Sequence, residues 1–169
     1  MGIDPGSLIT GWGIVEIEGN QLTHIANGSL YIKSKPFPPR LQEIYQGLTK
    51  VIEEYKPSEA SVEQVFVSRN AQSALKLGHA RGVAIIAALN AGMEIHEYTP
   101  TEIKQAVTGT GRAAKEQVGL MVQTLLALPA PAQTDASDAL AAAICHILKP
   151  SDLALLIPPT TRRIRRSKR

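Results

Sequence analysis

The alternation of apolar and polar residues predicts a chain that begins with a β-hairpin. Residues 11–18 and 22–33 are rich in Ile, Val, Leu and Tyr, and Gly19-Asn20 between them is typical of a tight turn. From Leu41 to Tyr55 the apolar residues follow the spacing i, i+3, i+4, i+7, which predicts a helix that ends at Lys56-Pro57.

The rest of the chain alternates strand-like and helix-like segments. Pro36 to Pro39 is expected to form a rigid connector that ends the hairpin. In chain order, the pattern then predicts a strand at 59–66, a long helix at 71–91, a strand at 94–98, a short helix opened by Thr99-Pro100, a helix at 113–128 and an Ala-rich helix at about 135–148. A hairpin followed by strand–helix units predicts an α/β fold, with a mixed sheet and helices on both faces.

Length and composition are those of one globular domain. The chain has 169 residues, of which 44% are hydrophobic and 20% charged. Cys145 is the only cysteine, which excludes an internal disulfide and a cysteine-based zinc cage. No apolar run is long enough for a membrane helix, and no signal peptide is visible at the start. We therefore expect a cytoplasmic protein with a folded domain at 1–149 and no contact with a membrane.

Positive charge is concentrated at one end of the chain. The net charge is +3, but six basic residues lie within 162–169, so the remaining residues carry a net charge of −3. A basic tail of this kind, here 150–169, is typical of a flexible arm that contacts nucleic acid, although it can also serve only as a solubilising terminus. A polyanion that binds the rest of the chain must use a local basic patch.

Two carboxylates stand at unusual places in predicted strands. Asp4 ends an apolar start and precedes Pro5-Gly6, which suits a metal or phosphate site, although an Asx turn is an equally good interpretation. Glu63 lies in the apolar segment 60–66, where a charge is costly unless it is paired, bound to a metal or at the rim of the sheet. The alternative is that strand alternation places Glu63 on a solvent-exposed face.

A second pair of carboxylates opens the last predicted helix. Asp135 and Asp138 are three positions apart, so both side chains project from one side of the helix. Capping is the alternative, with Thr134 or Asp135 as the N-cap. If the four acids meet, their oxygen ligands favour Mg²⁺, with Mn²⁺ as a substitute, and two such ions can promote phosphodiester hydrolysis.

Four motifs follow one another along the chain: Gly2-Ile3-Asp4-Pro5-Gly6-Ser7, Val62-Glu63-Gln64-Val65-Phe66, the segment from Ala74 to Gly82, and Asp135-Ala136-Ser137-Asp138-Ala139-Leu140. In this order they resemble the RuvC family of bacterial Holliday-junction resolvases, within the ribonuclease H-like superfamily. The resemblance implies a five-stranded ribonuclease H-like sheet in a homodimer that nicks two opposed strands of four-way junction DNA with Mg²⁺. It also implies ligatable 5′-phosphate and 3′-hydroxyl ends, a preference for a short thymine-containing site, and cooperation with the RuvA–RuvB branch-migration complex.

The resemblance also implies roles for individual residues. It makes Asp4, Glu63, Asp135 and Asp138 the catalytic metal ligands, with Asp4 bridging two ions. It places Phe66 against junction bases, and Lys104 and Lys115 near the scissile strand. Further phosphate contacts are expected at Arg69, Lys76, Arg81 and Arg112. The helix at 71–91 is the expected dimer interface, and His79 on it is expected to be an interface or surface residue rather than a catalytic one.

Two alternatives and one departure remain open from the sequence. Gly-Ile-Asp-x-Gly also begins the phosphate-binding hairpin of actin-like ATPases and sugar kinases, although those proteins need a second domain and a second phosphate loop. A catalytically silent junction-binding module is the other alternative. The family has several apolar residues before Gly-Ile-Asp where this chain has Met1 alone, so we expect a shortened central strand that lowers stability and loosens Asp4.

Overall fold

Five strands form one mixed sheet in the computed structural model, which describes residues 1–32, 36–65 and 70–149. The strand order is β3-β2-β1-β4-β5. Strands β1, β2 and β3 pair antiparallel, whereas β4 pairs parallel with both β1 and β5. The bounds are Gly2–Asp4 for β1, Ile9–Glu18 for β2, Gln21–Tyr31 for β3, Glu59–Glu63 for β4 and Glu94–Tyr98 for β5. The predicted hairpin is thus confirmed, and the central strand is three residues long.

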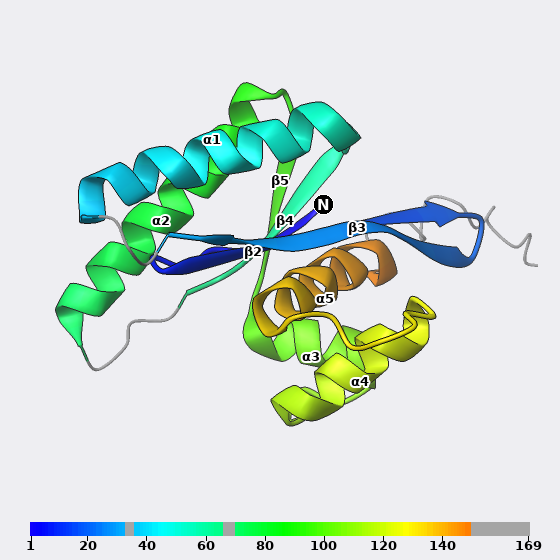
Figure 1. The fold of residues 1–169 in the computed structure, drawn as a ribbon. Helices are drawn as coiled ribbons and strands as arrows, with labels where there is room; N and C mark the ends of the chain where they lie inside the picture. Colours follow the sequence, from blue (N-terminus) through cyan, green and yellow to red (C-terminus); the bar gives the residue numbers. More distant parts are fainter. Residues whose placement is uncertain (33–35, 66–69, 150–169) are drawn as a thin grey trace, which may run out of the picture.

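Helices cover both faces of the sheet, as the sequence predicted (Figure 1). One face carries α1 (Phe37–Tyr55) and α2 (Ala71–Asn90). The other carries α3 (Pro100–Thr108), α4 (Lys115–Leu125) and α5 (Thr134–Leu148). None of the helices in the described ranges is both long and apolar enough to cross a membrane.

Strand alternation decides which side chains face which layer of helices. Ile3 and Val62 are fully buried in the core under α1 and α2. Because successive side chains of a strand point to opposite faces, their neighbours Asp4 and Glu63 face α5. The face under α1 and α2 therefore carries an apolar core, whereas the face under α5 carries a second core and the carboxylates of Asp4 and Glu63.

Several boundaries differ from the sequence prediction. Helix α1 begins at Phe37, so Pro38 and Pro39 lie in its first turn rather than in a connector. Proline is tolerated there because the first N–H groups of a helix have no intrahelical partner. Strand β4 ends at Glu63 instead of continuing to residue 66, and α4 is shorter than predicted. The expected basic tail lies outside the described residues.

Candidate active site

Parallel pairing brings Asp4 and Glu63 to the same edge of the sheet. Ile3 pairs with Val62 between β1 and β4, and each carboxylate is the last residue of its strand. Both side chains are partly buried and face α5. Two acids that are far apart in the sequence are thus neighbours at the carboxyl ends of adjacent strands.

Glycine allows the start of α5 to lie directly on this edge. Gly11 of β2 is paired with Asp4, and a Cβ atom at Gly11 would lie 2.0 Å from the backbone oxygen of Asp135. One turn further along α5, a Cβ at Gly2 would lie 1.9 Å from the backbone oxygen of Ala139. Any side chain at these positions would push the helix outward. The glycines therefore place Asp135 and Asp138 next to Asp4.

Gln133 caps α5, so the expectation that Thr134 or Asp135 does so is wrong. Gln133 Oε1 accepts hydrogen bonds from the backbone N–H of Asp135 at 3.1 Å and of Ala136 at 3.3 Å. Gln133 Nε2 donates to Asp135 Oδ2 at 2.7 Å, while Ser29 Oγ donates to Gln133 Oε1 at 2.5 Å. Because the amide satisfies the helix terminus, neither aspartate is needed as its cap.

The electrostatics of the four acids reflect their closeness. Burial, followed by the charges of Asp138, Glu63 and Asp135, raises the pKa of Asp4 to about 7. Burial and Asp138 raise the pKa of Glu63, and burial raises the pKa of Asp138 despite a nearby lysine. Like charges that share a site disfavour ionisation, and a cation removes this conflict. An all-oxygen donor set of this kind fits a hard divalent ion such as Mg²⁺ or Mn²⁺.

Two basic side chains lie beside the acids. Lys115 Nζ is 2.5 Å from Asp138 Oδ2. Lys104 and Lys115 line a cleft of about 280 Å³ together with Glu63 and Asp138. A second cleft of about 400 Å³ also contains Lys115 and Asp138 and runs along α4 past Leu120. The Lys115–Asp138 ion pair therefore lines both of these solvent-accessible clefts.

The other predicted DNA contacts within the described residues do not line the cleft that contains Lys104 and Lys115. Arg81 is held internally: its Nε donates to the backbone oxygen of Glu63 at 3.2 Å, and its guanidinium pairs with Glu97. Lys76 and His79 both contact the ring of Phe37, and Arg112 is exposed after α3. Two further candidates, Phe66 and Arg69, lie outside the described residues.

Sequence reasoning missed the residues that support the acids. Gln133 gave no signal because glutamine is not among the preferred N-cap residues. Ser29 is 104 positions away from it and meets it only through tertiary structure. Gly11 and Gly13 did carry a signal, since glycines that alternate in a strand mark one face where another backbone can approach.

Comparison with known proteins identifies the family. The family described as "Crossover junction endodeoxyribonuclease RuvC" matches residues 1–146. The chain belongs to the RuvC family. A RuvC protein of Geobacter sp. (strain M21) is 55% identical over 157 residues, which cover 92% of this chain and 96% of that protein. A RuvC protein of Pelobacter propionicus is 60% identical over 148 residues, covering 87% and 84%.

A solved RuvC structure agrees with this assignment. Thermus thermophilus RuvC in complex with a Holliday junction substrate matches with a TM-score of 0.82 at 34% identity, over 87% of this chain and 91% of that chain. The ribonuclease H-like fold is thereby confirmed. As a RuvC protein, the chain is an endonuclease, a hydrolase that acts on crossover junctions in DNA. The actin-like or sugar-kinase alternative is set aside, because the family that matches residues 1–146 is one of endodeoxyribonucleases.

Proposed function

We propose that the chain resolves four-way junction DNA by paired nicking, and that Asp4, Glu63, Asp135 and Asp138 hold the Mg²⁺ ions for this hydrolysis. The observation that carries the proposal is the convergence of four carboxylates beside an open cleft, where burial and then the charges of the other three acids raise the pKa of Asp4 to about 7. A protein that only bound DNA would gain nothing from acids near phosphates, because they repel the backbone. This argues against the silent junction-binding alternative.

The chain's own residues have distinct parts in the proposed reaction. The four carboxylates fix the cations at the sheet edge, and Gln133 orients one of them. A pair of divalent cations supplies Lewis acidity that activates water and stabilises the leaving oxygen. Lys104 and Lys115 face the same cleft, where their ammonium groups attract the scissile phosphate. Phe66, expected to stack on junction bases, and Arg69, Lys76, Arg81 and Arg112 remain predicted DNA contacts.

Paired nicking requires two active sites, and α2 offers a surface on which two chains can meet. Leu75, Ile86 and Leu89 are large apolar residues that are exposed on this helix. Gly78 and Gly82 fall on the same stripe, and a Cβ at either would meet no atom within 4 Å. The spacing of 3, 4, 4 and 3 residues is that of helices that pack closely along a seam. We therefore propose a homodimer through α2, and light scattering should give the mass of two chains.

One further partner follows from the family resemblance. The RuvA–RuvB complex is proposed to act with this chain at the junction. Apart from the resemblance, whose motifs do not reach it, the tail at 150–169 is proposed to add salt-sensitive, nonspecific DNA affinity through the six basic residues within 162–169. If a chain that ends at residue 159 binds DNA as tightly as the full chain at low salt, the tail has no such role.

Cleavage of a synthetic four-way junction, compared with a linear duplex of the same sequence, tests the proposal. The wild-type chain should nick two opposed strands of the junction with Mg²⁺ and none with chelator. Asp4→Asn and Asp138→Asn should each abolish cleavage while junction binding in a gel-shift assay persists. Glu53→Gln, an exposed acid on α1 across the sheet, is the matched control and should cleave normally.

Two results would overturn the metal assignment. Cleavage by both asparagine variants at the wild-type rate would show that Asp4 and Asp138 are not needed as metal ligands. Cleavage in the presence of chelator would show that the reaction needs no divalent cation. Loss of binding together with cleavage in a variant that has lost its circular dichroism spectrum would show a structural role instead.

A further inference from the structure

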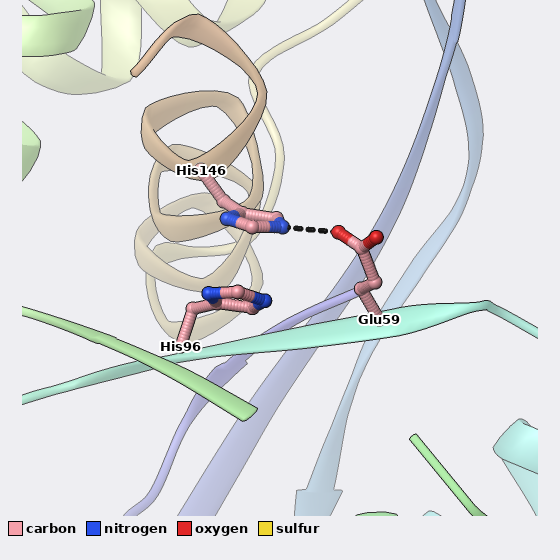
Figure 2. A group of neighbouring side chains, drawn as sticks. All are labelled: Glu59, His96 and His146. Carbon is pink, nitrogen blue, oxygen red and sulfur yellow. Dashed lines mark hydrogen bonds and ion pairs between the residues drawn. The ribbon is translucent and has the colours of Figure 1, made fainter. Parts of the chain in front are cut away.

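Glu59, His96 and His146 form a second group of ligand-type side chains (Figure 2). This group lies at the opposite end of β4 from Glu63 and the other acids. Glu59 is the first residue of β4, and Glu63 is the last. Four strand residues span about 13 Å, so the two groups are separate. His96 comes from β5, and His146 lies in the last turn of α5. Three elements therefore contribute one side chain each.

The ligand atoms of these residues are close together. One nitrogen or oxygen from each of Glu59, His96 and His146 lies within 4.8 Å of the others. His146 Nε2 is 2.5 Å from Glu59 Oε2, and the two imidazole rings stack with centroids 4.1 Å apart. Figure 2 shows that each ring turns a nitrogen toward the side on which the Glu59 carboxylate lies.

One of these atoms lacks a hydrogen bond. His96 Nε2 is buried and has no hydrogen-bond partner among the described residues. The nearest carboxylate oxygen, Glu94 Oε1, is 3.6 Å away, which is too long for a hydrogen bond. A buried polar atom without a partner costs free energy, and a bound cation would remove that cost.

The second histidine is oriented as metal ligands usually are. His146 Nδ1 is 2.7 Å from the Tyr98 hydroxyl. Because a hydroxyl both donates and accepts, it can accept from Nδ1–H and leave Nε2 as a lone-pair ligand. Without a cation, a proton lies between Nε2 and Glu59 Oε2, and it leaves to solvent when a cation takes its place.

The chemistry of this group differs from that of the acidic site. Two imidazoles and one carboxylate suit Zn²⁺ and similar ions, whereas Mg²⁺ prefers oxygen ligands alone. A cavity of about 480 Å³ is lined by Glu59 and His146, so solvent reaches the group and water can complete a tetrahedral site.

We propose that Glu59, His96 and His146 form a second cation site that binds Zn²⁺ or a similar imidazole-preferring ion. The ion links β4, β5 and α5 at the end of the sheet away from the acids. Its effect is on stability and not on the chemistry of cleavage. The proposal stands apart from the function proposed above, because it uses none of the four acids.

Co²⁺ binding to the full-length, untagged and chelator-treated chain tests this site. Tetrahedral Co²⁺ gives visible absorption. The Asp4→Asn/Asp138→Asn background lacks two ligands of the acidic site, so the absorption reports on the second site alone. We expect one equivalent of Co²⁺ to bind with a visible band, Zn²⁺ to displace it and excess Mg²⁺ not to. Zn²⁺ should also raise the melting temperature of this background.

Two variants separate binding from folding. His96→Gln should weaken Co²⁺ binding about tenfold or more, whereas His79→Gln, an exposed histidine on α2, should leave it unchanged. His96→Gln on the wild-type background should still cleave junctions with Mg²⁺, which shows that it folds. Absence of the visible band, its loss with excess Mg²⁺, or equal Co²⁺ affinity in His96→Gln would overturn the proposal.

Discussion

Lys115 Nζ lies 2.5 Å from Asp138 Oδ2, so an ion pair joins the first residue of α4 to the second turn of α5. Burial lowers the pKa of Lys115, but the hydrogen bond and the charges of Asp138, Asp4 and Asp135 outweigh it and raise the pKa. The Asp138 side chain is 24% exposed, so the pair is partly shielded from solvent. A lysine thus provides part of the positive charge at the proposed cation site.

Lys115→Met should therefore separate cation binding from cleavage. Removing an ammonium group that repels a divalent ion should tighten Mg²⁺ binding a few-fold, measured by calorimetry. Removing a cation that faces the scissile phosphate should slow single-turnover cleavage by about tenfold or more. Lys50→Met, on an exposed part of α1, is the control and should change neither. Weaker Mg²⁺ binding in Lys115→Met would show that the lysine supports the carboxylates instead of competing with the ion.

Gln133→Ala should affect both stability and cation binding. Loss of the cap should cost about 1 kcal/mol, which lowers the melting temperature by roughly 2–4 °C. Without the hydrogen bond to Asp135, the Mg²⁺ concentration for half-maximal cleavage should rise about tenfold or more. Junction cleavage across an Mg²⁺ titration measures this change.

Two comparisons locate the cause of the Gln133 effect. Ser29→Ala removes only the outer hydrogen bond and should give a smaller shift in the same direction. Gln46→Ala, exposed on α1, should give none. If Gln133→Ala lowers the melting temperature but leaves the Mg²⁺ dependence unchanged, the residue acts as a cap alone.

The fold and the four candidate acids could be predicted from the sequence, because both are indicated by local patterns. Periodicity placed the hairpin and the helices, and Glu63 stood out as a charge in an apolar strand. The supporting contacts could not be predicted in this way. The partners Ser29 and Gln133 meet only after the chain has folded, and the same holds for the stacked rings of His96 and His146. A pattern along the chain locates residues on a face, but it does not show which faces meet.

Arg81 has two possible roles that kinetics can distinguish. Its Nε bond to the Glu63 backbone, at 3.2 Å, and its ion pair with Glu97 make it a positioning residue for Glu63. We therefore expect Arg81→Met to slow cleavage of the bound junction more than it weakens binding. Lys76→Met should do the reverse if Lys76 contacts phosphate. A loss of affinity in Arg81→Met with an unchanged single-turnover rate would support the phosphate contact that the sequence predicted.

Asp4 should make the chain less stable as the pH rises. Burial and three neighbouring acids raise its pKa to about 7, whereas the unfolded value is 3.8. Between these values the folded state binds more protons than the unfolded state, so stability is highest below pH 3.8 for this group and falls until about pH 7. Other groups also titrate at low pH, so the effect is isolated by comparing Asp4→Asn with the wild type.

Asp4→Asn should accordingly raise the melting temperature at pH 8 in chelator, by roughly 2–4 °C for each kcal/mol recovered. The gain should shrink at pH 5, where the Asp4 carboxyl is mostly protonated in the folded wild type. Mg²⁺ should stabilise the wild type at pH 8 but have little effect on the variant, because the cation offsets the same repulsion that the substitution removes. Scanning calorimetry at both pH values measures these differences. If the gain is the same at pH 5 and pH 8, the carboxyl does not ionise in that interval, and the four acids are not coupled as their positions in the fold require.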